Sequence, residues 1–138
     1  MSSISDFEKS FERATKIVTT KSENAITSAV VNTLANIITD TPVDTGQLRG
    51  NWQTTLGSPS NISLEGLTDP SGVGTVAKSK RALKKFKLSS GEDIFMTNNL
   101  NYATRIEFGH YSSQAPQGMV RINLAKFKEI LESEVKKR

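Results

Sequence analysis

The first forty residues carry apolar side chains at intervals of three and four, the spacing of one helix face. A first stripe comprises Ile4, Phe7, Phe11, Ala14 and Val18, and a second one comprises Ala25, Ala29, Val30, Leu34, Ile37 and Ile38. The polar residues 21–24 separate the two stripes, and Thr20 with Glu23 has the spacing of a helix-starting capping box. We therefore expect a long helix, either continuous or with a break or kink at residues 21–24. It should end before Pro42 because proline disfavours a helical residue in front of it.

The centre of the chain predicts two strands joined by a long polar segment. A turn at residues 42–46 leads to an expected strand over 51–56, and a second apolar run predicts a buried strand over 93–97. Residues 57–75 are rich in Gly, Ser, Pro, Asn and Asp, which favours a loop with at most a short strand near residues 62–64. The basic residues 76–88 that follow are expected to form a short exposed helix or a mobile loop.

The last forty residues predict two helices and a third strand. A short helix is expected from Tyr102 to Phe108, both at least half buried, with Gly109 in the left-handed position that ends it. Alternating apolar residues over 120–124 predict a strand, after which Asn123 is expected to cap a final helix.

These elements together predict an α+β fold, in which a long N-terminal helix and a C-terminal helix pack with a small, mostly antiparallel β-sheet. The chain of 138 residues is the size of one domain. We expect residues 1–138 to form that single domain, with a flexible or partly helical basic insertion at about residues 70–91.

Composition removes several kinds of chemistry. The chain has no cysteine and one histidine, so disulfides, thiol nucleophiles, sulfur-ligated zinc and multi-histidine sites within one chain are excluded. No cofactor motif is found, and no cofactor is expected. No apolar run approaches the roughly 18–20 residues that span a bilayer, so no membrane association is expected.

The net charge of +4 comes from one segment. Six cations lie within ten residues: Lys78, Lys80, Arg81, Lys84, Lys85 and Lys87. Such a cluster attracts phosphates or an acidic protein face, and it is also typical of a plain solvated surface. Binding of nucleic acid through residues 78–87 is therefore one open function.

Two catalytic motifs match in residue type, but their sequence context does not fit catalysis. Asp44-Thr45-Gly46 spells the aspartic-protease triplet, but it follows a helix and a proline, and turn chemistry explains it without catalysis. Asp44 is expected to accept amides of the turn, and Gly46 to adopt a conformation that is costly for other residues. His110 with Glu107, Ser112 and Ser113 spells a hydrolase triad, but no nucleophile elbow accompanies it. We expect no enzymatic activity.

Three blocks of the sequence carry a family resemblance. They are residues 41–52 (T-P-V-D-T-G-Q-L-R-G-N-W), residues 98–110 (N-N-L-N-Y-A-T-R-I-E-F-G-H) and residues 114–120 (Q-A-P-Q-G-M-V). In this order and with similar intervals they resemble the tail-completion proteins of long-tailed double-stranded DNA bacteriophages, whose first block reads T-P-V-D-T-G-x-L-R-x-S-W. Position 51 holds Asn where that family commonly has Ser.

The resemblance implies a virion structural protein of the phage neck or tail, assembled in the bacterial host cytoplasm. It implies joining of parts at the head–tail junction, with tail-terminator, tail-tube, adaptor or portal rings as partners. It also implies a homo-oligomeric ring in the virion, a possible monomer when isolated, and DNA only as cargo of the channel. Partner contacts are expected at the six cations and in the loop after Gly109, at His110, Gln114, Ala115 and Pro116, where the last three could instead pack on their own chain.

Overall fold

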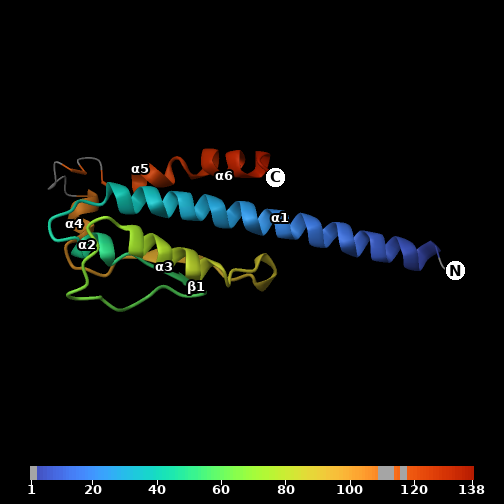
Figure 1. Ribbon diagram of the computed structural model, residues 1–138, viewed down its shortest axis with the longest axis horizontal. Helices are drawn as coiled ribbons and strands as arrows, with labels where there is room; N and C mark the ends of the chain where they lie inside the picture. The colour runs from blue at the N-terminus through green and yellow to red at the C-terminus, as the bar shows by residue number, and fades with distance from the viewer. Residues whose placement is uncertain (1–2, 109–113, 116–117) are drawn as a thin grey trace.

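The computed structural model describes residues 3–108, 114–115 and 118–138, and its longest element is one unbroken helix. Helix α1 spans Ser3–Asp40, 38 residues, and its N-terminal part projects beyond the rest of the molecule (Figure 1). Of the two forms expected, the helix takes the continuous one, with no break at residues 21–24. Those polar residues mark the point where the helix enters the body, since the Glu23 carboxylate accepts the Leu88 amide at 2.8 Å.

The body consists of a two-stranded sheet and the helices around it. Strand β1 (Gln53–Leu56) pairs with β2 (Ile94–Thr97) in antiparallel register, Gln53 opposite Thr97 and Leu56 opposite Ile94. Helix α3 (Val73–Leu83) packs against β1 and α1, while α6 (Phe127–Lys136) lies along α1. The α+β prediction is confirmed: a long N-terminal helix, a C-terminal helix and a small antiparallel sheet.

Shorter helices complete the described chain. They are α2 (Gln47–Gly50), the 3-10 helix η1 (Leu88–Ser90), α4 (Ala103–Phe108) and α5 (Arg121–Leu124). Helices α2 and α4 lie near the C-terminal end of α1 (Figure 1). The main apolar cluster is also at this end, and its buried members are Ile37, Ile38, Leu48, Trp52, Ala103 and Met119.

Several local expectations were wrong. The first strand begins two residues later than expected, after the unexpected helix α2, and residues 62–64 form no strand. Residues 121–124 form helix α5 and not a strand, because the Glu107 carboxylate gathers the amides of Met119, Val120 and Arg121 as they converge at a helix N-terminus.

Two side chains also differ from expectation. Asn123 does not cap α6; it is buried and donates to the Asp40 carboxylate at 2.8 Å and to the Met119 carbonyl at 2.7 Å. Phe108 is 59% exposed, because it lies on the outer side of α4, where the Arg121 guanidinium covers its ring at 4.7 Å. Tyr102 is partly buried, and β2 is also only partly buried.

Candidate interaction surfaces

The first block of the family resemblance closes the end of α1. The Thr41 hydroxyl donates to the Ile37 carbonyl at 2.6 Å and accepts the indole N–H of Trp52 at 2.8 Å. Thr41 is completely buried and Trp52 is nearly so. A buried indole N–H needs an acceptor, so this hydroxyl allows the aromatic ring to enter the core without an unpaired donor.

Arg49 clamps the same helix end. Its guanidinium donates to the carbonyls of Thr39 (2.7 Å), Thr41 (2.9 and 3.1 Å) and Pro70 (2.6 Å). The last carbonyls of a helix have no hydrogen-bond donor within the helix and carry a partial negative charge. A guanidinium at this position supplies the missing donors and a compensating positive charge. Arg49 also ties the loop before α3 to α1.

Gly46 lies in the turn between α1 and α2, with φ at +93° as expected. Its carbonyl accepts the amides of Gly50 and Asp69, each at 2.9 Å. A Cβ added here would lie 2.5 Å from the Pro70 nitrogen, so both conformation and space require glycine.

The role expected for Asp44 in this turn is not found. Among the described residues it is the Thr45 hydroxyl that accepts a turn amide, from Gln47 at 3.2 Å, and Asp44 is exposed. Burial and the nearby Asp44 carboxylate together raise the pKa of Tyr102.

Asn51 and Asn99 fasten the loop between β1 and α3, and Asn98 fastens α2. Asn51 is completely buried; its amide donates to the carbonyls of Gln47 and Leu64 and accepts the Leu64 amide at 2.7 Å. Asn98 donates to the Leu48 carbonyl, and Asn99 donates to the carbonyls of Ser60 and Ile62. A serine at position 51 is too short to make the three bonds of Asn51, so the larger residue has a definite structural role here.

Glu107 is a buried carboxylate that holds residues 119–121 at the start of α5. It accepts the amides of Met119 (2.7 Å), Val120 (2.8 Å) and Arg121 (3.0 Å), and it pairs with the Arg121 side chain at 3.1 Å. Burial by itself raises the pKa of Glu107, but these hydrogen bonds outweigh it and lower the pKa below the ordinary value. A carboxylate so fully engaged is not available as a catalytic base.

The loop expected to contact a partner is described only in part. Gln114 accepts the Val43 amide at 3.0 Å and donates to the Val43 carbonyl at 3.2 Å, so the third block is joined to the first. Ala115 is 3% exposed and is covered by its own chain. The expectations for Gly109, His110 and Pro116 lie outside the described residues.

The basic segment forms a helix, one of the two forms expected for it. Asp69 accepts the amide and the hydroxyl of Thr75 at 2.8 and 2.7 Å, and these bonds lower the pKa of Asp69 although burial raises it. Thr75, Ser79 and Leu83 form the buried face of α3, and the Ser79 hydroxyl bonds to Thr54 of β1 at 2.7 Å. These contacts favour an ordered helix over the mobility that its glycine-rich flanks indicated.

All six cations are exposed. Lys78, Lys80 and Arg81 on α3 are exposed, as are Lys84, Lys85 and Lys87 after it. Within the described part of the chain none of the six forms an ion pair. We call these six exposed cations together the basic surface.

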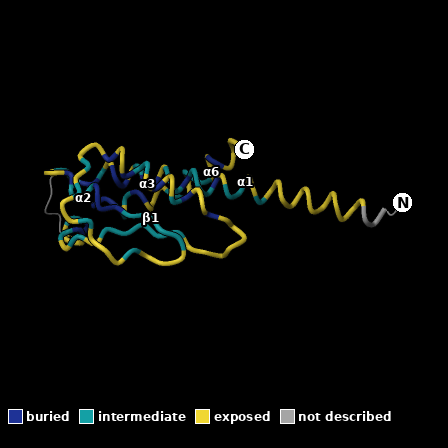
Figure 2. The backbone as a smooth tube through the Cα atoms, turned by 60° about the horizontal axis from the view of Figure 1, so that its bottom comes forward, coloured by how far each residue is buried: buried dark blue, intermediate teal, exposed yellow. Residues whose placement is uncertain are grey.

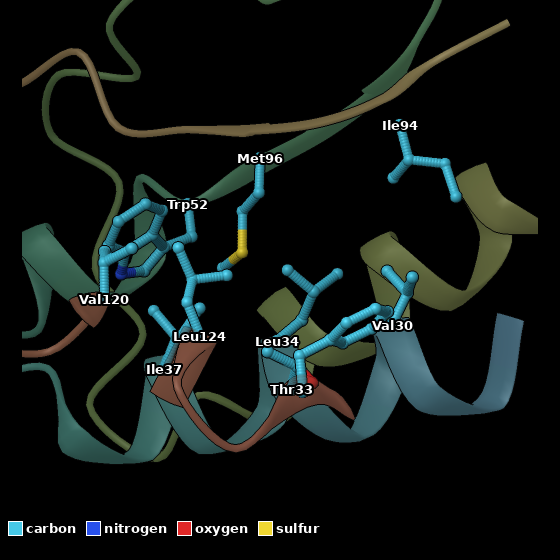
Figure 3. A pocket seen from close by; sticks show the side chains of 10 residues that line it. Val30, Thr33, Leu34, Ile37, Trp52, Ile94, Met96, Val120 and Leu124 are labelled. Atoms are coloured by element: carbon cyan, nitrogen blue, oxygen red, sulfur yellow. The ribbon is translucent and has the colours of Figure 1, made fainter. Parts of the chain in front are cut away.

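An apolar groove of about 310 Å³ lies over the C-terminal part of α1 (Figure 3). Val30, Leu34 and Ile37 of α1 contribute to it, Met96 enters from β2, and Leu124 comes from α5. Sequence reasoning did not find this groove, because it forms where the sheet and the α5–α6 segment pack separately on α1.

The N-terminal half of α1 is the least covered part of the described chain. Residues 6–21 are all exposed except Thr19, and the exposed tube runs out from the body in Figure 2. Phe7 and Phe11 are 69% and 64% exposed, and their rings stack with centroids 6.4 Å apart. We call residues 3–22 the arm.

The described residues form neither a metal-binding cluster nor a membrane-spanning helix. No three acidic or histidine side chains lie close enough together to hold a metal ion. Nor does any described helix have the length and apolar character needed to cross a membrane.

Comparisons with protein-family models, with curated proteins and with solved structures found no match to this chain.

Sequence reasoning missed the two residues that join the most segments. Arg49 stands in the first block, and a cation shortly after a helix end could have been identified as a cap of that helix. Glu107 lies twelve residues before the amides that it binds, and a lone acid at that distance gives no periodic signal.

Acid is expected to destabilise the protein through Glu107 and Asp69. Because both folded-state pKa values are lowered, each carboxylate stabilises the fold above its unfolded-state pKa, near pH 4, and loses that contribution as pH falls through the folded-state pKa. Urea unfolding at pH 7, 5, 4 and 3 should show a constant free energy down to about pH 5 and a steep fall below pH 4. A free energy that is unchanged at pH 3 would contradict this assignment.

Proposed function

We propose that this chain is a virion structural protein of a long-tailed double-stranded DNA phage, acting at the head–tail junction. It completes the tail or joins it to the connector through assembly into a ring and through contacts with the neighbouring neck and tail proteins. The proposal rests on the resemblance of the three sequence blocks to tail-completion proteins.

One observation supports it beyond the letters of the sequence. The three blocks pack on one another: Gln114 bonds to Val43, Asn98 bonds to Leu48, and Glu107 binds Met119 and Val120. Sequence blocks that occur together in one order are expected to contact one another if they stabilise a common fold. The contacts between the three blocks agree with that expectation.

The test uses the genome that encodes the chain. Deleting its gene should leave filled heads and tails that fail to join or complete, seen by electron microscopy, and expression from a plasmid should restore infectivity. Mass spectrometry of purified wild-type particles should detect the chain. Infectious particles without the gene, or particles that lack the chain, would overturn the proposal.

Binding to nucleic acid is the second candidate, because the six cations are exposed and unpaired within the described chain. Such binding would weaken steeply as salt rises, since each phosphate contact releases counterions. A mobility-shift titration with duplex and single-stranded DNA at about 50 and 200 mM salt distinguishes the two functions.

Charge reversal of the basic surface should affect binding and leave the fold intact. The variant K80E/R81E/K84E/K85E changes exposed side chains, so its unfolding free energy should stay within about 1 kcal/mol of wild type. We expect it to slow joining to the partner, because steering by charge acts on the association rate. Full complementation of the gene deletion by this variant, with normal circular dichroism, would show that the cations serve only solvation.

A further inference from the structure

The arm presents an apolar seam that the described chain leaves uncovered. Phe7, Phe11 and Val18 are 69%, 64% and 63% exposed, although the same helix is well buried from Ala25 onward. Large apolar side chains gathered on one projecting helix, away from the body, are typical of an interaction surface.

The spacing of the seam indicates what covers it. Ile4, Phe7, Phe11, Ala14 and Val18 alternate intervals of three and four, as do the a and d positions of a heptad. Of the positions beside the seam, Glu8, Ser10 and Thr15 are polar and Ile17 is apolar, so the apolar stripe is narrow along most of its length. A narrow stripe matches one facing helix better than the broad face of a sheet.

Charge permits that facing helix to be another copy of the arm. The arm holds three acidic and four basic residues, which nearly cancel. Of the positions flanking the seam only Glu8 is charged, so two arms bring no like charges together beside it. The basic surface lies on the body and takes no part.

We propose that the arm pairs antiparallel with the arm of a second copy of this chain. Antiparallel heptads place a positions against d positions, and the register with the longest overlap of the two arms sets residue n opposite residue 25 − n. Phe11 then meets Ala14 of the other copy and Phe7 meets Val18, so in these two layers a large side chain faces a smaller one. The outer layer places Ile4 opposite Lys21.

The length of the arm agrees with this register. Residue 3 lies opposite residue 22, and Glu23 is where the body begins, through its bond to Leu88. Each arm therefore runs along the whole of the other and ends where the other body starts. The two bodies lie at opposite ends of the pair, where they do not collide. This pairing does not depend on the proposed virion role.

Sedimentation velocity of the full chain from about 1 to 100 µM tests the pairing. The apparent mass should double across that range, and Phe11→Glu should keep the chain monomeric with an unchanged thermal transition of the body. Val73→Glu is the matched control, since Val73 is 71% exposed on the body, and it should dimerise like wild type. A wild-type chain that stays monomeric, or a Phe11→Glu variant that dimerises normally, would overturn the proposal.

Two further measurements test where the arm docks and whether the two arms pair antiparallel or parallel. Leu124→Glu, at the edge of the apolar groove, should leave dimerisation unchanged; its loss would mean that the arm docks in the groove instead. The chain has no native cysteine, so introduced thiols report cleanly. Val18→Cys mixed with Phe7→Cys should form a disulfide dimer, whereas Val18→Cys alone should not, because antiparallel pairing separates its two copies by about 16 Å. A disulfide in Val18→Cys alone would show parallel arms and overturn the register.

Discussion

Replacing Glu107 by alanine should lower the free energy of unfolding by about 3–5 kcal/mol. The substitution leaves three amides and the Arg121 guanidinium without the carboxylate that they share, in a site where Glu107 is only 6% exposed. Buried donors without an acceptor cost more than the bonds themselves contribute. Urea or thermal unfolding monitored by circular dichroism measures the loss, which corresponds to a fall in Tm of roughly 10–20 °C.

The isosteric variant Glu107→Gln distinguishes charge from shape. It keeps one acceptor oxygen but presents an NH₂ group to donors, so its loss should approach that of alanine. It should also remove part of the destabilisation below pH 4, since no carboxylate remains to be protonated at that position. A Glu107→Ala protein as stable as wild type would show that the carboxylate does not hold α5.

Gly46→Ala should destabilise the protein by at least about 3 kcal/mol, and Gly46→Val should prevent folding to a stable state. Two costs combine: φ is +93°, and the new Cβ would lie 2.5 Å from the Pro70 nitrogen and 2.9 Å from the Asp69 carbonyl carbon. Both neighbours are backbone atoms or part of a proline ring, which cannot rotate away. The loop that carries Asp69 would have to separate from α2.

Gly66→Ala is the matched control. Gly66 has a similar φ of +80°, but a Cβ there meets nothing within 4 Å. It should therefore cost only about 1–2 kcal/mol, the strain of a left-handed residue. The difference between the two alanine variants measures the steric term by itself, and equal losses would show that crowding by Pro70 has no effect.

Periodic and turn signals predicted most of the fold. The long helix, the run that became β2 and the short helix before Phe108 each follow from local spacing, and the left-handed Gly46 follows from its place after a proline turn. The basic residues were also correctly expected on one exposed segment, because consecutive cations rarely find burial.

The errors share a physical origin. Residues 120–124 alternate like a strand, but the distant Glu107 carboxylate collects their preceding amides and makes the segment helical. Asn123 was expected to cap the helix that follows it, but its side chain donates to Asp40 at the C-terminal end of α1. In each case the polar bonds of one side chain to a distant segment outweigh the local pattern, and the sequence alone does not show which segment that is.

Because α1 is continuous, it acts as a stiff rod, or strut, that runs from the body to the tip of the arm. Its 38 residues contain neither proline nor glycine, the usual sites of kinks, and span about 57 Å. Arg49 fixes one end of this strut by binding three carbonyl groups, while the arm extends freely from the other. A small rotation of the clamped end sweeps the tip of the arm through a much larger arc. A contact that turns one end of α1 would therefore reorient the other end, because no proline or glycine lies along the helix to bend it.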